Sequence, residues 1–327
     1  KGKSITNQGK AENRYKKIAP ILRGELAVTT ESPDWPYERF IIRPLISEET
    51  LNFVDSKEGR EIAQTPPLTA DHLIRIKPYP LWIDRPEYDN KDKLREQISN
   101  AIQEYEGKYD GYLNRHSKRL KTEVKRFDSK PRVIMMPGLG IICAGRNVVE
   151  ADIAKDITGH TVSAKRKIAS MGKYEGLSEE HLFDMEYFSL QHAKLEGEKE
   201  RSLDSSVAVI TGAAGAIGAG ICEELLKNGC HVAATDLPGK RLDSLVDDLR
   251  EGFGKRIIGV SIDVTDPDSV SGGFEEIIEN WGGIDLVIVN AGVAHVSSLA
   301  NMEPEDFRNI EKVNIEGTLN TLSEATR

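Results

Sequence analysis

The stretch SSVAVITGAAGAIGAGICEELLKNGCHVAATD, residues 205–236, decides the fold of the C-terminal part of this chain. A short run of Val, Ile and Ala leads into a glycine-rich turn, a helical pattern follows, and a second apolar run ends in Asp236. Continuous apolar strands that alternate with helices predict a parallel sheet buried on both faces. A glycine-rich turn between a strand and a helix is a typical site for the phosphates of a dinucleotide.

The same alternation continues to the end of the chain. Apolar runs at 256–266 and 284–292 are predicted strands, and the patterns at 241–254, 267–283 and 303–327 are predicted helices. Parallel strands of this kind are joined by right-handed crossovers. We therefore expect an α/β fold in which a doubly wound parallel sheet, the Rossmann arrangement, occupies the last third of the chain.

Three glycines of the turn have separate physical roles. Gly212 permits the tight turn, Gly215 leaves room for a pyrophosphate, and Gly218 lets the helix approach the sheet. The start of the helix adds free N–H groups and the positive end of the helix dipole, both of which favour phosphate. The turn therefore predicts a dinucleotide site.

The choice of dinucleotide depends on Asp236, which closes the second strand 24 residues after Gly212 (236 − 212). A carboxylate at this point accepts hydrogen bonds from a ribose diol and repels a 2′-phosphate, so we predict NAD rather than NADP. Lys240 and Arg241 follow closely, and a basic side chain there would relax this preference.

The spacing TGxxxGxG resembles the short-chain dehydrogenase/reductase family over residues 205–327. The resemblance implies adenine contact by Asp263 and a part for Asn314 in organising a proton relay, so Asn314 is the catalytic candidate. The alternative for Asn314 is an asparagine that bends its helix or binds water, and the alternative for the domain is a Rossmann fold that has lost its cofactor. The cofactor-binding residues implied are Gly212, Ala214, Gly215, Ile217, Gly218, Asp236, Asp263, Val264, Asn290, Ala291 and Gly292.

The same resemblance places the family's main chemistry beyond Arg327. There a Ser and a Tyr-x-x-x-Lys pair carry out the reaction, with the Tyr hydroxyl as general acid/base and the Lys lowering its pKa. The chain also begins at Lys1 rather than at Met. We therefore expect an internal fragment of a longer protein, one that transfers no hydride by itself and leaves a sheet edge exposed.

Residues 131–160 resemble the end of a class II aldolase/adducin domain. Two apolar runs, 133–136 and 141–143, flank a Pro-Gly-Leu-Gly turn and predict a hairpin, and an amphipathic helix follows from Val148. In the family this turn carries a metal-binding His, whose place Leu139 takes here, and the family's upstream His-x-His pair is also missing. We therefore predict no metal site in this chain, with zinc expected only in an intact aldolase module.

The remaining N-terminal segments differ in composition and in hydrophobic periodicity. The basic stretch 1–30 predicts a mobile arm or a helix, and the Pro-rich stretch 31–90 predicts short strands and turns. A helix within 91–129 is predicted from one apolar stripe, which we interpret as core: Leu94, Ile98, Ile102, Tyr105 and Tyr109.

A further helix is predicted from a cap at Ser178 to about Lys194, before a charged linker. The linker, at about 196–205, is the predicted domain boundary. We expect an aldolase-like domain with a helical extension at 1–200 and the first part of a dehydrogenase domain at 201–327.

His72 is the best candidate in the N-terminal part for a role near a metal or a phosphate. Arg75 and Lys77 follow it, and a neutral imidazole beside two cations suits a sugar phosphate. The alternative is a loop histidine that is solvated or hydrogen-bonded. For His160, His181 and His192, packing or solvent exposure is the default interpretation.

An aldolase-like part joined to a dehydrogenase resembles the bifunctional rhamnulose-phosphate aldolase/short-chain alcohol dehydrogenase family. The segments TPPLTADHLIRIKPYPLWID (65–84) and EGLSEEHLFDMEYFSLQHAKL (175–195) carry this resemblance. It implies cleavage of a ketose 1-phosphate and NAD-dependent oxidation of the lactaldehyde-like product in sugar catabolism. The alternatives are a non-catalytic dinucleotide-binding protein and an adducin-like regulatory or structural module.

Composition restricts the partners. The formal net charge of −9 gives no general support for binding nucleic acid or an anionic membrane, and no run is long and apolar enough to span a bilayer. Three cysteines form neither a disulfide framework nor a metal motif. We expect a cytoplasmic enzyme, a homo-oligomer, that acts on small sugar-phosphate or aldehyde substrates.

Overall fold

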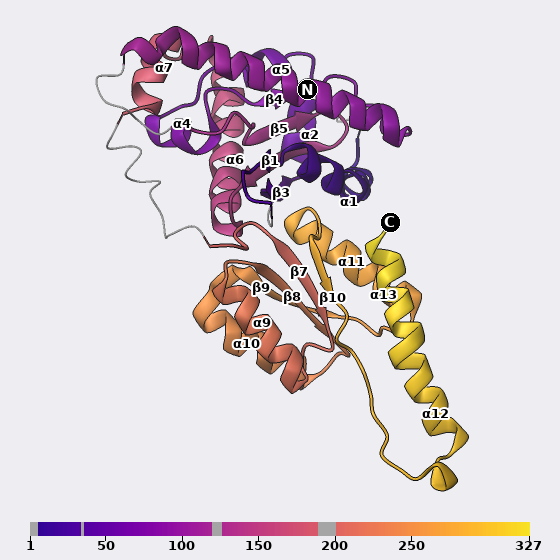
Figure 1. Ribbon diagram of the computed structural model, residues 1–327. Helices are drawn as coiled ribbons and strands as arrows, with labels where there is room; N and C mark the ends of the chain where they lie inside the picture. Colours follow the sequence, from indigo (N-terminus) through magenta and orange to yellow (C-terminus); the bar gives the residue numbers. More distant parts are fainter. Residues whose placement is uncertain (1–5, 34–35, 120–125, 189–200) are drawn as a thin grey trace. The chain divides into compact units, whose positions relative to one another are not determined.

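The computed structural model describes residues 6–33, 36–119, 126–188 and 201–327. The chain divides into two compact units, Lys1–Glu200 and Arg201–Arg327, which are described separately below (Figure 1). Both units combine helices with a sheet. No described helix is long and apolar enough to cross a membrane.

The second unit is built on a sheet of four parallel strands. These are β7 (Val207–Thr211), β8 (His231–Asp236), β9 (Ile257–Ser261) and β10 (Leu286–Ile288), in the spatial order β10-β7-β8-β9. The predicted doubly wound parallel sheet is confirmed. The strand predicted at 284–292 is shorter than expected, because pairing with β7 extends over three residues only.

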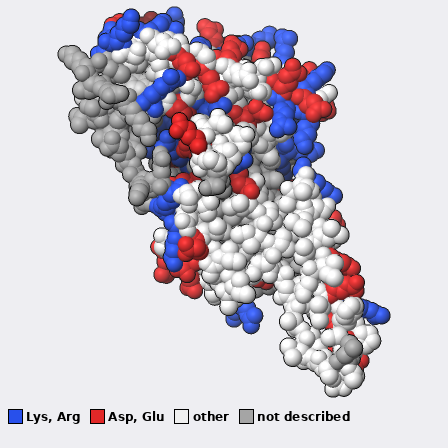
Figure 2. All heavy atoms as spheres, viewed as in Figure 1, with Lys and Arg blue, Asp and Glu red and all other residues white. Residues whose placement is uncertain are grey.

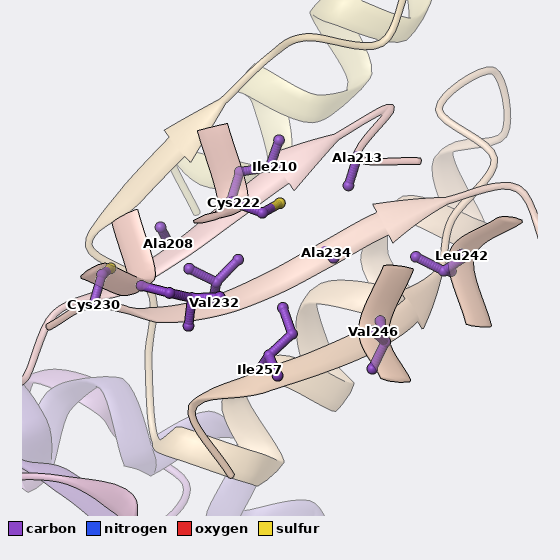
Figure 3. Packing of buried hydrophobic residues seen from close by; sticks show 11 residues of the cluster. Ala208, Ile210, Ala213, Cys222, Cys230, Val232, Ala234, Leu242, Val246 and Ile257 are labelled. Atoms are coloured by element: carbon purple, nitrogen blue, oxygen red, sulfur yellow. The ribbon is translucent and has the colours of Figure 1, made fainter. Parts of the chain in front are cut away.

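Helices cover both faces of this sheet, as a parallel sheet requires. Helices α9 (Ala216–Lys227) and α10 (Lys240–Phe253) pack on one face, and α11 (Pro267–Trp281) lies on the other (Figure 1). Figure 3 shows the core beneath α9 and α10, where apolar side chains of the strands meet apolar side chains of both helices. The members of this cluster are Ala208, Ile210, Ala213, Cys222, Leu226, Cys230, Val232, Ala234, Leu242, Val246 and Ile257.

The helix predicted at 303–327 is interrupted, so that prediction was wrong in detail. The chain forms α12 (Pro304–Glu311), a π-helical turn (Lys312–Glu316) and α13 (Gly317–Ala325). The wider turn places Asn314 against Val293, and the hydroxyl of Thr318 donates to the carbonyl of Asn314. π-Turns inside helices are frequent at functional sites.

The first unit has its own sheet of four strands. Its order is β3-β6-β5-β4, from β3 (Ile41–Leu45), β6 (Gly140–Gly145), β5 (Val133–Met136) and β4 (Leu81–Trp82). The predicted hairpin is confirmed, because β5 and β6 pair antiparallel, whereas β4 and β5 are parallel. A separate pair joins two-residue strands, β1 (Val28–Thr29) and β2 (Tyr37–Glu38).

Among the described residues of this unit, three long helices and several short ones surround the sheet. The long helices are α1 (Gln8–Glu25), α5 (Lys91–His116) and α6 (Val148–Met171). The stripe predicted on α5 is buried along its whole length, so its interpretation as core is confirmed. The last described helix, α7 (Glu179–Glu186), starts at the predicted Ser178 cap. It ends at Glu186 with Tyr187 as its C-cap, so the predicted continuation to about Lys194 was wrong, and His192 lies outside the described residues.

The Pro-rich stretch holds more helix than expected. Besides short strands it forms α2 (Glu48–Val54), α3 (Gly59–Ala63) and α4 (Ala70–Ile76). The prolines lie outside these helices, and two of the helices begin at capping side chains, Ser47 and Thr69. Proline therefore limits the length of these elements without excluding helix.

Candidate functional site

The glycine turn of the second unit is fixed by close backbone packing at two of its glycines. Gly212 has a φ of +65°, and a Cβ on it would lie 2.7 Å from the Cα of Ala291. A Cβ on Gly218 would lie 2.4 Å from the carbonyl oxygen of Gly212 and 2.7 Å from the Cα of Ala213. The chain's own packing therefore requires glycine at both positions.

Gly215 is different, because no contact with the described part of the chain requires glycine there. Its φ is −77°, and a Cβ would approach only the carbonyl oxygen of Gly212, at 3.4 Å. Gly215 is the N-cap of α9, whose first turn has no side-chain cap to take its N–H groups. Backbone donors at a helix start, beside a position without a Cβ, fit the pyrophosphate of a dinucleotide.

Asp236 joins the end of β8 to this turn. One carboxylate oxygen accepts a hydrogen bond from the N–H of Ala214 at 2.9 Å, and the other accepts from the N–H of Leu237 at 2.8 Å. Each oxygen keeps a further lone pair. Asp236 therefore shapes the turn and also presents a carboxylate beside it, where a ribose diol would bind.

Asn290 also braces the turn, a role that its sequence motif did not predict. Its side-chain amide donates to the carbonyls of Thr211 and Gly212, both at 3.0 Å. The hydroxyl of Thr211 in turn accepts from the N–H groups of Asn290 and Ala291. Thr211 was not among the predicted site residues, although it is the Thr of the TG pair that opens the motif.

Asp263 and Val264 lie after β9, on the far side of β8 from the turn. The Asp263 carboxylate accepts from the N–H and the hydroxyl of Thr265, and these bonds lower its pKa. The Val264 side chain is buried against Gly317, and its carbonyl accepts from the amide of Asn320. The structure gives both residues a role in local order. Adenine contact by Asp263 and cofactor binding by Val264 stay predictions.

Asn314 forms a reciprocal pair with the backbone of Val293. Its oxygen accepts from the Val293 N–H and its amide donates to the Val293 carbonyl, both at 2.9 Å. Gly292 lies beside this pair, where a Cβ would be 3.4 Å from the Asn314 oxygen. The pair fixes the segment that follows Asn290, so Asn314 is a positioning residue here, and its part in catalysis stays a prediction.

The structure therefore brings most of the predicted residues together. Those around the turn are joined by the contacts above, Ile217 is exposed on the first turn of α9, and Asn314 is joined to the turn through the segment after β10. The residues around the turn are Gly212, Ala214, Gly215, Gly218, Asp236, Asn290 and Ala291. Asp263 and Val264 are separate from this group.

The turn between β5 and β6 in the first unit is a packed corner. Leu139, at the position where the aldolase resemblance expects a His, is fully buried. The carbonyl of Gly138 accepts from Arg14 at 2.7 Å, and its N–H donates to Asp55 at 2.7 Å. Among the described residues, no group of three or more His, Cys, Asp and Glu side chains has a geometry that could hold a metal ion.

His72 lies on α4 and not on a loop, which corrects that part of its interpretation. Its Nδ1 is 3.5 Å from the hydroxyl of Thr161, and its ring meets the ring of His160 edge to face. The side chain of Lys77, expected near it, is instead buried against Asp128 and Tyr109. His72 and Lys77 therefore do not form the cationic cluster that their spacing suggested.

Comparison with known proteins agrees with this architecture. The family model described as aldolase class II, second domain, matches residues 13–195, and the model described as short chain dehydrogenase matches residues 206–327. The chain thus combines an aldolase-type unit with a Rossmann unit of the short-chain dehydrogenase class, whose fold implies a nicotinamide dinucleotide cofactor. It belongs to the class II aldolase family through its first unit, fused to a short-chain dehydrogenase domain.

Several relatives share one or both units. A Bacillus subtilis protein described as uncharacterized oxidoreductase YuxG is 29% identical over 280 residues, which is 85% of this chain and 39% of that protein. L-2,3-butanediol dehydrogenase of Corynebacterium glutamicum is 35% identical over 34% of this chain and 43% of its own. The crystal structure of sorbitol-6-phosphate 2-dehydrogenase SrlD from Erwinia amylovora is 32% identical over 36% of this chain and 47% of its own, with a TM-score of 0.35. The chain spans less than half the length of these proteins.

Replacing Gly215 with alanine separates ligand binding from folding. Because the new Cβ makes only an ordinary contact within the chain, and alanine is a poorer N-cap than glycine, we expect the free energy of unfolding to fall by no more than about 1 kcal/mol. The methyl group would occupy the space above the helix start, so we expect affinity for NADH to fall by about tenfold or more, which is about 1.4 kcal/mol. Titration of NADH fluorescence measures this. Unchanged affinity for NADH would show that the pyrophosphate does not bind beside Gly215.

Proposed function

We propose that the second unit binds NAD and that the protein is an NAD-dependent dehydrogenase acting on a short alcohol or aldehyde. The observation that carries this proposal is the Asp236 carboxylate, held by the Ala214 N–H beside the open helix start at Gly215. The substrate class is supported by relatives whose names specify small polyols, L-2,3-butanediol dehydrogenase and the D-threitol dehydrogenase of Mycolicibacterium smegmatis.

Different groups around the turn would bind different parts of a dinucleotide. The first turn of α9 would hold the pyrophosphate through its N–H groups, and Asp236 would accept hydrogen bonds from the adenosine ribose. A negative charge at Asp236 disfavours a 2′-phosphate, since like charges at this spacing repel. A bound nicotinamide would supply hydride transfer, and Asn314 would position the segment at Val293 beside it.

The Asp236→Asn variant tests the choice of cofactor. Asparagine keeps an oxygen that can accept from the Ala214 N–H but removes the negative charge, so the turn should persist while repulsion of a 2′-phosphate disappears. We expect the ratio of NADPH to NADH affinity to rise about tenfold or more. Fluorescence titration of both reduced cofactors against wild type and variant gives this ratio.

A matched control is Asp243→Asn, which removes a charge from the first turn of α10 outside the glycine turn. This change should leave the ratio within about twofold, as expected for a screened surface charge. If Asp236→Asn lowered the affinity for NADH and for NADPH equally, the Asp236 carboxylate would not be the group that recognises the adenosine ribose. The preference for NAD would then have to come from another residue.

For the first unit we propose a part in cleaving a ketose 1-phosphate, so that the intact protein would serve sugar catabolism such as that of rhamnose. The match to the class II aldolase model supports this. The packed corner at Leu139 means that a zinc ion, if the intact aldolase module uses one, would take its ligands from other residues. The alternative, a dinucleotide-binding or adducin-like protein without catalysis, predicts cofactor binding but no turnover of aldehydes or alcohols.

We further propose a homo-oligomer in the cytoplasm. Large apolar side chains are exposed along α12, the π turn and α13, among them Phe307, Ile315, Leu319 and Leu322. Figure 2 shows that much of the second unit's surface in that view carries few charged side chains. Exposed apolar surface of this kind is typical of an interface. Sedimentation velocity measures the assembly directly.

A further inference from the structure

A pocket of about 360 Å³ lies between α3, β4 and α5 in the first unit. Its size is within the range of sites that bind small molecules. Helix α3 contributes Arg60, β4 contributes Trp82, and α5 contributes Glu104, Tyr105 and Lys108. None of these residues belongs to the dinucleotide site, so the pocket is a separate feature of the aldolase-type unit.

The floor of the pocket is apolar and aromatic. Leu81 and Tyr105 line it and are buried, and the indole of Trp82 forms part of the same wall. The hydroxyl of Tyr105 donates to the carbonyl of Tyr79 at 3.1 Å, so the polar end of this ring already has a partner. A floor of this kind contacts the carbon-bound hydrogens of a ligand.

The indole nitrogen of Trp82 is not satisfied by the protein. It is shielded from water, and within the described part of the chain its N–H donates to no acceptor. A buried indole N–H usually has a partner, and a missing hydrogen bond there costs free energy. Packing alone therefore does not explain a tryptophan at this wall. An oxygen of a bound ligand, reached by a small rotation of the ring, would supply the acceptor.

The rim of the pocket carries charged side chains that are exposed. Arg60 is 3.6 Å from the carboxylate of Asp84, but both side chains are more than half exposed, and such a pair is weak. The amine of Lys108 lies 4.7 Å from the centre of the Tyr79 ring. Among the described residues, no group forms an ion pair with the Glu104 carboxylate. The rim thus has two cations and one carboxylate, an excess of one positive charge.

We propose that this pocket binds a small polyhydroxylated monocarboxylate, the chemistry of an open-chain sugar acid. The guanidinium of Arg60 would pair with the ligand carboxylate, with Lys108 as a second cation. Glu104 would accept hydrogen bonds from ligand hydroxyls, and the rings of Trp82 and Tyr105 would contact the carbon backbone. A single negative charge matches the excess charge of the rim, whereas Glu104 would disfavour the dianion of a phosphate ester.

This inference concerns binding in the first unit and assigns no reaction to the pocket. It does not depend on the nicotinamide site of the second unit or on cleavage of a ketose phosphate. Its test needs no cofactor and no turnover, so its failure and the failure of the proposed function are distinguishable.

Isothermal titration of the whole 327-residue chain with four matched ligands tests the proposal. D-Gluconate carries a carboxylate and hydroxyls, glucitol lacks the carboxylate, hexanoate lacks the hydroxyls, and glucitol 6-phosphate carries a dianion instead. We expect gluconate to bind with a dissociation constant of about 1 mM or lower and the other three at least about tenfold more weakly. No binding of gluconate, equal binding of hexanoate, or tighter binding of the phosphate ester would overturn the proposal.

Variants of the rim identify the site. Arg60→Gln should lower the affinity for gluconate about tenfold, because it removes the cation that pairs with the carboxylate. Arg166→Gln is the matched control, since Arg166 on α6 is also exposed and pairs at 3.5 Å with an exposed carboxylate, that of Glu49. It should change the affinity by less than about twofold. Circular dichroism checks that both variants fold, and equal losses in the two would contradict the assignment.

Two further variants test the parts of the ligand that the pocket recognises. Glu104→Gln should lower the ratio of gluconate to hexanoate affinity about fivefold, because the charged acceptor for the hydroxyls is lost. Trp82→Phe keeps an aromatic ring but removes the N–H, so the affinity for gluconate should also fall, by about fivefold. An unchanged ratio in Glu104→Gln, or unchanged affinity in Trp82→Phe, would show that a sugar acid does not bind in this way.

Discussion

A Gly218→Ala variant is expected to lose both the stability of the second unit and its capacity to bind a dinucleotide. The added Cβ would lie 2.4 Å from the Gly212 carbonyl oxygen and 2.7 Å from the Ala213 Cα. Both are backbone atoms, which cannot move aside as a flexible side chain can. Overpacking of this kind costs about 3 kcal/mol. Relief of the clash would require α9 to move away from the turn, so NADH affinity should fall together with stability.

Gly220 is the matched control, because it lies in the same helix and a Cβ on it would meet nothing within 4 Å. Gly220→Ala should stabilise the unit by about 0.5–1 kcal/mol, since alanine favours a helix more than glycine does. Hydrogen exchange of peptides from β7 and β8 in increasing urea reports on this unit alone. Equal stability of the two variants would contradict the packing described for the turn.

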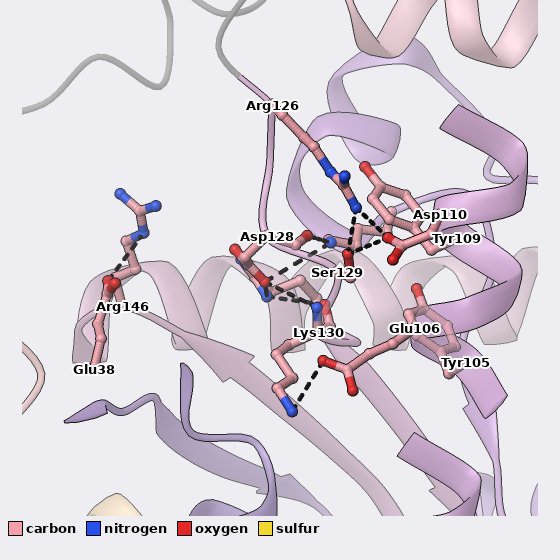
Figure 4. A network of polar contacts seen from close by, with 12 residues as sticks. Glu38, Tyr105, Glu106, Tyr109, Asp110, Arg126, Asp128, Ser129, Lys130 and Arg146 are labelled. Carbon is pink, nitrogen blue, oxygen red and sulfur yellow. Dashed lines mark hydrogen bonds and ion pairs between the residues drawn. The ribbon is translucent and has the colours of Figure 1, made fainter. Parts of the chain in front are cut away.

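The second large effect is expected in the first unit, where Asp128 holds two buried cations. Its carboxylate pairs with Arg132 through both oxygens and lies 3.9 Å from the amine of Lys77 (Figure 4 shows the surrounding network). Burial raises the pKa of Asp128, but Arg132 and Lys77 outweigh it and hold the pKa well below its usual range. Asp128→Ala would leave both cations buried and unpaired, so we expect a loss of about 3–5 kcal/mol.

Asp110→Ala is the control, because Asp110 pairs with Arg126 in the same network but both side chains are about half exposed (Figure 4). Its removal should cost no more than about 1 kcal/mol. Hydrogen exchange of the β5 and β6 peptides in urea measures both variants. If the two losses were equal, the buried pair would not stabilise the unit as its geometry indicates.

The pH dependence of the stability loss in Asp128→Ala follows from the direction in which folding shifts the pKa of Asp128. A carboxyl group whose pKa is lowered by folding contributes its stability above the unfolded pKa, about 3.9, and loses it as the pH falls toward the folded pKa. The difference between wild type and variant should therefore be constant from about pH 5 to 6 and narrow below about pH 4. Below neutral pH Lys77 is also charged, because burial lowers its pKa only to about 7.

Local patterns in the sequence were enough to predict the second unit. Its strands are continuous apolar runs, and its glycine turn lies between a strand and a helix, so neither depends on distant residues for its recognition. The bracing of the turn was not predictable in the same way. Thr211 and Asn290 are about 80 residues apart in sequence and meet because β10 pairs with β7.

The first unit was less predictable. Its short helices begin at caps such as Thr69 but are too short for an apolar period to show, and Pro-rich composition suggested turns instead. Spacing placed Lys77 near His72, whereas the fold turns Lys77 toward Asp128, which is 51 residues away. Burial against another segment decided the partner, and spacing along the chain carries no information about it.

The sequence by itself determined that this chain has a Rossmann unit with a turn for a dinucleotide, because backbone freedom at Gly212 and hydrophobic periodicity are local properties. Only the tertiary structure decided what each residue does there. It showed that Gly212 and Gly218 serve the packing of the chain while Gly215 leaves space beside the helix start, and that Asp236 is bonded to the turn itself. It also buried the Lys165 amine against the carbonyl of Thr65, with no ion pair among the described residues. Such outcomes depend on which segments meet in space, and long-range packing alone fixes that.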